Sequence, residues 1–305
     1  MDYQTYISTQ KTKKTFAKGW ILACRPETKT LSVCLIPILV SIALVYKHTK
    51  SIDWILFLSA CFFAPCIQMG MNMIGDALDY KKGEVLENKL GDQRAALFPI
   101  QHILNGGYFF LTLAAIFALP LMVAGGGLYV VLVCVSIACA YCYTGGPYPF
   151  GYLGLSEFLL LIFYGWVAVL ATYYIQTHTW NASVLLAGAQ MGCLAIVPLA
   201  INNFRDYQAD ALIQKKTLAV RFGLLFSRWE ITLFSLLPFI VGLFWISEEK
   251  NKWMAFLPCF VLIPTVRNLW FIWNRDPSRE STASIARSAK IQLGFGLLLI
   301  LGSFM

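Results

Sequence analysis

The most constraining feature of this sequence is a series of long apolar runs that contain almost no charged residues. The hydrocarbon core of a bilayer is about 30 Å thick, and an α-helix needs roughly 20 apolar residues to cross it. Backbone groups find no water there, so a spanning segment has to be a helix or part of a closed barrel. The runs are continuous, whereas barrel strands alternate apolar and polar residues. The sequence therefore predicts membrane-spanning helices.

Composition agrees with this class, because only 13% of the 305 residues are charged, whereas a soluble domain carries about 25%. We expect an all-α integral membrane protein with about nine transmembrane helices in one bundle that extends over residues 1–305. The Gly125–Gly127 run is expected to form a tight turn between the third and fourth spans. The predicted spans lie near 31–46, 54–75, 108–123, 126–142, 155–175, 183–201, 229–247, 253–272 and 289–305.

The net charge of +8 is compatible with nucleic-acid binding, but the placement of the basic residues argues against this function. With the N-terminus in the cytoplasm, nearly all Lys and Arg residues fall on that side, as the positive-inside rule requires. The cytoplasmic parts are then a basic N-terminal segment, 1–24, and two loops, 80–98 and 204–226. The N-terminal segment has no apolar core typical of a signal peptide. We expect a protein of a bacterial inner (cell) membrane, in contact with membrane lipids and with no nucleic acid.

Polar residues gather at the cytoplasmic end of the second span. Asn72, Asp76 and Asp79 follow one another at i, i+4 and i+7, a spacing that places them on one stripe of a helix. Two carboxylates so close together repel each other and destabilise the helix unless a cation lies between them.

A second cluster of the same kind stands at the cytoplasmic end of the sixth span. Asn202, Asp206 and Asp210 lie at i, i+4 and i+8, and Asn203 is expected to join them. Four spans separate the two clusters, so both lie on the same face of the membrane. We interpret this as a parallel internal repeat in which spans one to four match spans five to eight, with span nine extra. Sites in repeat-built membrane proteins tend to lie between the halves.

The two clusters together predict a pocket that holds a cation and an anion. Four carboxylates, Asp76, Asp79, Asp206 and Asp210, form a set of hard oxygen ligands that favours Mg²⁺. No His or Cys lies among them, which disfavours zinc. Mg²⁺ prefers sites shared with substrate phosphates, and Lys and Arg residues follow both clusters. The pattern therefore indicates a Mg²⁺-bound diphosphate of a lipid. A cation-coupled transporter stays open as an alternative.

At these residues the chain resembles the UbiA superfamily of intramembrane aromatic prenyltransferases. Within it, the chain is most similar to the 1,4-dihydroxy-2-naphthoate prenyltransferase family of menaquinone synthesis. The resemblance is carried by an opening Arg-Pro-x-Thr motif, two Asp-rich motifs, a Gly-x-x-Arg and a Tyr/Gly/Pro loop. In this sequence they lie at Arg25–Lys29, Asn72–Gly83, Gly91–Arg94, Tyr143–Gly154 and Asn202–Gly223.

The chain departs from the family pattern at four positions. Gly75 stands where the family usually has a second Asn, and Val85 where it has an acid. Asp92 replaces a Pro and Gln214 replaces a Gly. The main Asp positions are kept, so these departures bear on the aromatic acceptor and on the prenyl chain length rather than on the diphosphate site.

The resemblance implies the reaction and roles for single residues. A polyprenyl diphosphate would bind through Mg²⁺ to both acidic clusters and ionise, and 1,4-dihydroxy-2-naphthoate would attack the allylic cation and lose its carboxyl group, giving demethylmenaquinone. Asp76, Asp79, Asp206 and Asp210 would be the metal-binding and catalytic residues. The substrate-binding candidates are Asn72, Asn202, Asn203, Lys81, Arg94, Arg205, Lys215, Tyr143 and Tyr152.

Several alternatives stay open on the sequence alone. The acceptor is open, because another aromatic ring such as 4-hydroxybenzoate suits the same site. A family member without catalysis is a further alternative, kept open by Gly75 and Gln214. Aromatic faces can shelter a carbocation, and Tyr143, Tyr152, Tyr164 and Trp166 are candidates for that role. The prenyl length and the oligomeric state do not follow from the sequence.

Overall fold

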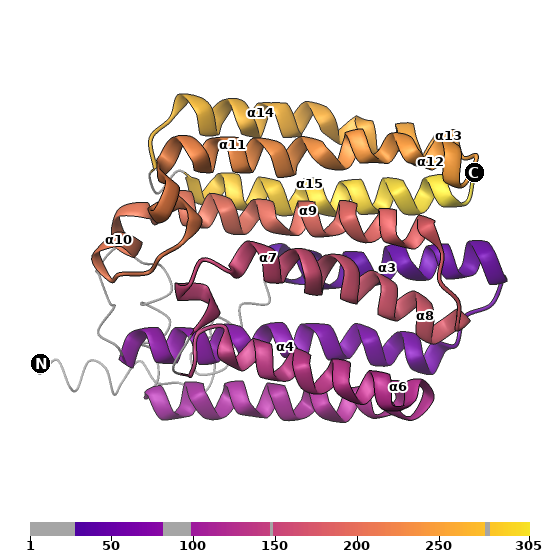
Figure 1. The fold of residues 1–305 in the computed structure, drawn as a ribbon, viewed down its shortest axis with the longest axis horizontal. Helices are drawn as coiled ribbons and strands as arrows, with labels where there is room; N and C mark the ends of the chain where they lie inside the picture. The colour runs from indigo at the N-terminus through magenta and orange to yellow at the C-terminus, as the bar shows by residue number, and fades with distance from the viewer. Residues whose placement is uncertain (1–27, 82–98, 147–148, 278–280) are drawn as a thin grey trace, which may run out of the picture.

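The computed structural model describes residues 28–81, 99–146, 149–277 and 281–305, without the side chains of 28–31 and 79–81. Every regular element in these residues is a helix (Figure 1). The longer elements are α3 (Thr28–Thr49), α4 (Trp54–Lys81), α6 (Ile100–Cys142), α9 (Ala182–Arg205), α11 (Leu218–Val241), α14 (Leu262–Asn274) and α15 (Ser281–Ser303). The shorter ones are η1 (Phe150–Tyr152), α7 (Ser156–Leu160), η2 (Leu161–Ala171), α8 (Thr172–Thr177), α10 (Tyr207–Leu212), η3 (Gly242–Phe244), α12 (Trp245–Glu248), α13 (Lys252–Phe256) and η4 (Leu257–Val261).

Eight helical stretches in the described part of the chain are long and apolar enough to cross a membrane. One of them, α6, has 43 residues and would be about 65 Å long if it were straight, twice what a bilayer core needs. It is not straight, because Gly126 has φ 62° and ψ −151°, a left-handed conformation that favours glycine. Figure 1 shows the chain reversing at the α6 label. The predicted turn is confirmed, and α6 supplies two of about nine passes.

The helices extend further than the apolar runs that predicted them. Helix α11 begins at Leu218, about three turns before its predicted start, and α15 begins at Ser281, about two turns before its predicted start. Hydropathy marks only the apolar part of a helix, whereas the backbone stays helical into the polar boundary. The predicted loop 204–226 is accordingly partly helical, since it contains α10 and the start of α11. Gly223, with φ 86°, separates that start from the rest of α11.

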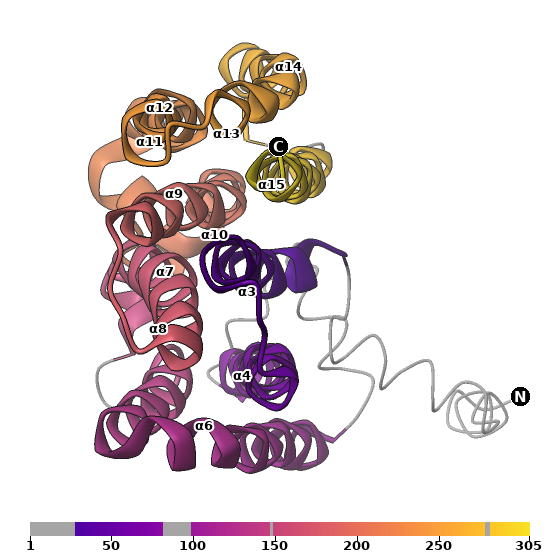
Figure 2. The same ribbon diagram turned by 90° about the vertical axis from the view of Figure 1, so that its right-hand side faces the viewer.

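Figure 2 looks along the helices and shows α3 inside the curve that the other helices form. Helix α3 packs against α4, α8, α9 and α15. Close packing also joins η2 to α9, because a Cβ on Gly165 would lie 2.7 Å from the carbonyl oxygen of Gly188 and 2.8 Å from the Cα of Gly192. Small residues allow such close approach where lipid offers no hydrophobic driving force. The parallel repeat stays a prediction.

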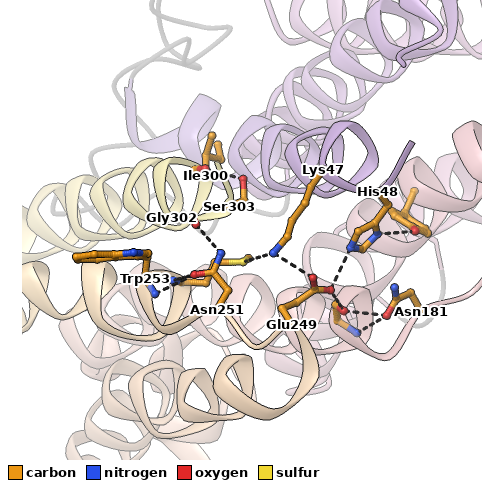
Figure 3. Close-up of polar contacts among 12 residues, drawn as sticks. Lys47, His48, Asn181, Glu249, Asn251, Trp253, Ile300, Gly302 and Ser303 are labelled. Carbon is orange, nitrogen blue, oxygen red and sulfur yellow. Dashed lines mark hydrogen bonds and ion pairs between the residues drawn. The ribbon is translucent and has the colours of Figure 1, made fainter. Parts of the chain in front are cut away.

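A polar network closes the end of the bundle where α3 finishes and α9 begins (Figure 3). The Glu249 carboxylate lies 3.0 Å from Lys47 Nζ and 3.0 Å from His48 Nε2, and it accepts a hydrogen bond from Ser183. Burial alone would raise the pKa of Glu249, but the hydrogen bonds from Ser183 and Lys47 outweigh it and lower that pKa. We call Lys47, His48, Ser183 and Glu249 the far-end clamp. It ties α3 to α9 and to the α12–α13 connection.

Candidate functional site

The two predicted acidic clusters lie at the same end of the bundle. Helices α4 and α9 both finish at the end where α10 lies, opposite the far-end clamp (Figure 1). We call this the site end. Asp76 is half-buried near the end of α4, and Asp206 joins α9 to α10. Asp210 is buried on α10. An even number of spans between the clusters requires this arrangement, as the sequence predicted.

At the end of α9, Arg205 holds the acidic cluster together. Its Nε donates to Asp206 Oδ1 at 2.8 Å and its Nη2 to Asp206 Oδ2 at 2.7 Å. The same Nη2 donates to Asn202 Oδ1 at 2.8 Å, and Nη1 reaches Thr282 of α15 at 3.2 Å. Such bidentate, charge-assisted pairs are the stronger class of hydrogen bond. The sequence suggested Arg205 as a diphosphate ligand; in the structure it donates these hydrogen bonds to the protein, and the diphosphate role stays a prediction.

Asn203 turns to a different partner from its neighbour Asn202. It is buried, and its Nδ2 donates to Glu157 Oε1 of α7 at 2.7 Å. Glu157 is itself buried and interacts electrostatically with Lys215 and with buried Glu230 of α11. Sequence reasoning missed both glutamates. The signal was present, because an ionisable residue within an apolar run is costly and usually has a role.

At the end of α4, hydrogen bonds run between helices in the direction of an apolar cavity. The hydroxyl of Tyr164 on η2 donates to Gln68 Oε1. Gln68 Nε2 in turn donates to Asn72 Oδ1 at 3.0 Å, one turn further along α4. Asn72 begins the predicted stripe of metal- and diphosphate-binding residues. The chain Tyr164–Gln68–Asn72, which we call the α4 relay, therefore joins that stripe to the cavity wall.

The cavity itself has a volume of about 140 Å³ and almost entirely apolar walls. Helices α3, α4, α6, α7, η2 and α8 supply nearly all of the lining residues. Two of the lining residues, Tyr143 and Tyr164, are among the aromatic residues predicted to shelter a carbocation. Ile175 of α8 also lines the cavity. This apolar lining suits a hydrocarbon chain rather than a polar solute.

The Tyr/Gly/Pro loop packs on the connection between α10 and α11. The backbone N–H of Lys216 donates to the carbonyl of Tyr152 at 3.1 Å. Gly154 has φ 68°, and a Cβ there would lie 2.6 Å from the carbonyl oxygen of Lys216, so only glycine fits. Lys215 Nζ lies 5.5 Å from the ring centroid of Tyr152, within cation–π range. Two predicted substrate-binding residues from different parts of the chain are thus brought together.

The same loop also packs against α4 beside Asp76. A Cβ on Gly75 would lie 3.1 Å from Thr144 Oγ1, tighter than nine in ten real Cβ contacts. An Asn at this position would require Thr144 to move by a few tenths of an ångström. Gly151 closes the loop by donating its N–H to the carbonyl of Tyr143 at 2.9 Å.

Three predicted residues are not placed by the structure. The side chains of Asp79 and Lys81 and the whole of Arg94 lie outside the described residues. Within the residues that are described, no three His, Cys, Asp or Glu side chains come together closely enough to hold a metal ion. The described part of the site therefore contains oxygen ligands and basic groups, but these residues do not form a three-ligand metal site by themselves.

Comparison with known proteins gives a consistent result. The model of the UbiA prenyltransferase family matches residues 34–293. The chain is 28% identical to a 1,4-dihydroxy-2-naphthoate octaprenyltransferase of Haemophilus influenzae, covering 93% of this chain and 95% of that one. It is 31% identical to the protein of that name from Escherichia coli, covering 68% and 69%.

Solved structures share the fold at low sequence identity. A UbiA homolog from Archaeoglobus fulgidus, bound to DMAPP and Mg²⁺, superimposes with a TM-score of 0.58 at 12% identity and covers 92% of this chain and 98% of that one. A digeranylgeranylglyceryl phosphate synthase gives the same TM-score at 15% identity, over 94% and 98%.

Proposed function

The chain belongs to the UbiA prenyltransferase family, and on that premise we propose that it transfers a polyprenyl group from polyprenyl diphosphate to 1,4-dihydroxy-2-naphthoate. The ring carbon that carries the carboxyl group gains the prenyl group, and the carboxyl group leaves as CO₂. The products are diphosphate, CO₂ and demethylmenaquinol, the reduced form of demethylmenaquinone. Bacterial relatives named for this acceptor, which match the chain over two thirds of its length or more, support this choice.

The observation that carries the proposal is the apolar cavity joined to the acidic stripe through the α4 relay. The cavity walls suit the prenyl chain, and Asn72 at the end of the relay begins the stripe proposed for the diphosphate. A substrate with a long hydrocarbon tail and an anionic head matches this division. Tyr143 and Tyr164 line the cavity, and their ring faces suit a developing allylic cation.

The donor set fits Mg²⁺. Asp206 is already paired with Arg205, and the described residues contain no cage of three acidic ligands. Mg²⁺ is usually held by one or two carboxylates together with substrate phosphates and water, so a metal that binds with the diphosphate suits these residues. We propose Asp76, Asp79, Asp206 and Asp210 as the residues that would hold it. Bound there, Mg²⁺ would stabilise the charge of the leaving diphosphate as a Lewis acid.

The protein's own groups would do the remaining work. We propose that Lys215, and with it Lys81 and Arg94, donates to diphosphate oxygens, while Arg205 keeps Asn202 and Asp206 in place. Lys215 is suited to this role because it stands over Tyr152 on the loop that packs against α4 and α10–α11. We also propose that the site end lies on the cytoplasmic side of a bacterial cell membrane, as the basic residues predict.

The test is a product assay with two acceptors. Membranes that contain the protein receive Mg²⁺, a polyprenyl diphosphate and either 1,4-dihydroxy-2-naphthoate or 4-hydroxybenzoate, and products are identified by mass spectrometry. We expect a prenylated naphthoquinol that is absent with the Asp76→Ala variant. Prenylated 4-hydroxybenzoate alone would overturn the proposed acceptor. No product with either, together with cation uptake into liposomes, would favour a transporter and overturn the proposal.

A further inference from the structure

The segment that carries Tyr164 has an unusual backbone. Residues Leu161–Ala171 are π-helical over their whole length, a conformation that is rare and occurs often at functional sites. The close contact of Gly165 with Gly188 and Gly192 of α9 fixes this segment in the bundle. Tyr164 is therefore held on a wall that cannot easily shift, with its hydroxyl directed to Gln68 on α4.

The chemistry of the three side chains sets the direction of the α4 relay. Tyr164 lines an apolar cavity, and an O–H group without an acceptor in such surroundings is costly. It therefore donates to Gln68, and the Gln68 oxygen must face the tyrosine. The Gln68 nitrogen then faces Asn72 and donates to Asn72 Oδ1. Because that oxygen is occupied, the Asn72 side chain presents its amide nitrogen, a donor, on its other side.

We propose that Gln68 is a positioning residue that turns the Asn72 amide so that its nitrogen donates to an anionic oxygen of the substrate. This inference rests on the proposed function, and it deepens it by specifying how Asn72, a predicted substrate-binding residue, would contact the substrate. Two substrate groups have the required chemistry: the diphosphate of the prenyl donor and the carboxylate of the aromatic acceptor. An Asn72 oxygen turned toward either of them would repel it.

The decisive variant is Gln68→Glu, which keeps the size of the side chain and its bond to Tyr164. A carboxylate accepts hydrogen bonds but does not donate them, so Asn72 would turn its nitrogen to the introduced carboxylate and its oxygen to the substrate. We expect the KM for the substrate that supplies the anionic oxygen to rise about tenfold, the loss of one charge-assisted hydrogen bond. Tyr164→Phe frees Gln68 to turn and is expected to have the same effect, but smaller.

Two measurements show whether the diphosphate or the carboxylate supplies the anionic oxygen that Asn72 contacts. If the diphosphate supplies it, a non-hydrolysable polyprenyl thiolodiphosphate will bind about tenfold more weakly to Gln68→Glu in the absence of any acceptor. If the carboxylate supplies it, the KM for the naphthoate acceptor will rise, and the difference will vanish with 1,4-naphthalenediol, which has no carboxylate. The thiolodiphosphate arm measures binding and does not require turnover, so it stands even if the proposed acceptor is wrong.

The chain contains a matched control. Gln101 Nε2 donates to Asn105 Oδ1 at 3.0 Å on α6, the same pair at the same spacing, but exposed. Gln101→Glu is expected to leave both KM values unchanged. Unchanged KM and binding in both Gln68→Glu and Tyr164→Phe would overturn the proposal, and so would an equal loss in Gln101→Glu. Tyr164→Phe keeps the test decisive if Gln68→Glu fails to fold.

Discussion

The ends of α4 and α9 carry the same Asn-x-x-x-Asp spacing, yet their side chains have different kinds of partner. On α9, the asparagine and the aspartate are bound by one arginine, which also reaches α15. On α4, the asparagine is bound by a glutamine and, through it, by a tyrosine in the cavity wall. The motif on α9 therefore belongs to an ionic network, whereas the similar motif on α4 belongs to a relay of uncharged side chains.

The difference indicates a division of work at the site end. Arg205 fixes the position of Asp206 and offsets its charge, so that the α9 end is arranged before a substrate arrives. The α4 end instead connects the acidic stripe with the cavity proposed for the prenyl chain. The first end is suited to holding the anionic head of the substrate, and the second to aligning that head with its hydrocarbon tail.

Removing the aspartate at either end, Asp76 on α4 or Asp206 on α9, should abolish the proposed prenyl transfer. Asp76→Ala and Asp206→Ala are each expected to lower turnover by at least about 100-fold, because both acids are proposed to stabilise the charge of the leaving group. Membrane insertion should stay normal. Asp206→Ala should also lower the melting temperature, since it leaves Arg205 without its carboxylate. Full activity in both variants would remove the proposed site.

Chelation tests whether the two ends act through a shared cation. Turnover is expected to stop in EDTA and to return with added Mg²⁺, because the diphosphate is proposed to bind to the acids through the metal. The far-end clamp contains no proposed metal ligand, so the melting temperature should change little. Unchanged turnover in EDTA would contradict the metal-binding role of both acidic ends.

Substitution of two basic residues separates positioning from substrate binding on the α9 side. Arg205→Gln removes one partner of a largely buried ion pair and is expected to cost roughly 3–5 kcal/mol of stability, together with part of kcat. Lys215→Gln should raise the KM for polyprenyl diphosphate and lower the melting temperature much less than Arg205→Gln, because it loses only a cation–π contact with Tyr152 and a charge interaction with Glu157. Thermal unfolding in detergent and steady-state kinetics distinguish the two. A selective KM effect in Arg205→Gln would show that this arginine binds substrate directly.

The smallest effect on activity is expected at the far-end clamp. Since the folded pKa of Glu249 lies below its unfolded value, its contribution to stability is present above the unfolded pKa and is lost as the pH falls through the folded pKa. Glu249→Gln should therefore cost about 1.5–3 kcal/mol near neutral pH, and the difference from wild type should shrink as the medium becomes acidic. Melting temperatures measured from neutral pH downward check this. A pH-independent difference would contradict the assigned charge pairing.

Much of the fold could be predicted because lipid imposes strong rules on sequence. Continuous apolar runs identified the spans, and Gly126 marked the reversal within α6. The starts of the helices were harder to predict, because α11 and α15 begin in polar residues at the membrane boundary that give no apolar signal. For the site, the spacing of Asn and Asp indicated which helix ends matter.

The partners of these residues could not be predicted in the same way. Arg205 sits next to Asp206 in the chain, and the two side chains pair where α9 ends and α10 begins. Gln68 and Tyr164 lie 96 positions apart, and a helical repeat pattern gives no information on such a contact. The direction in which Asn203 turns likewise depends on Glu157 from another helix.

The proposal as a whole requires that this chain couples prenyl transfer to decarboxylation of a naphthoate at the acidic ends of α4 and α9. The coupling is measured with 1,4-dihydroxy-2-naphthoate labelled in its carboxyl carbon and supplied with polyprenyl diphosphate and Mg²⁺. We expect one labelled CO₂ for each prenylated naphthoquinol, and neither product with Asp76→Ala or Asp206→Ala. A prenylated product that retains the label, or release of labelled CO₂ that does not depend on these two aspartates, would contradict the proposal.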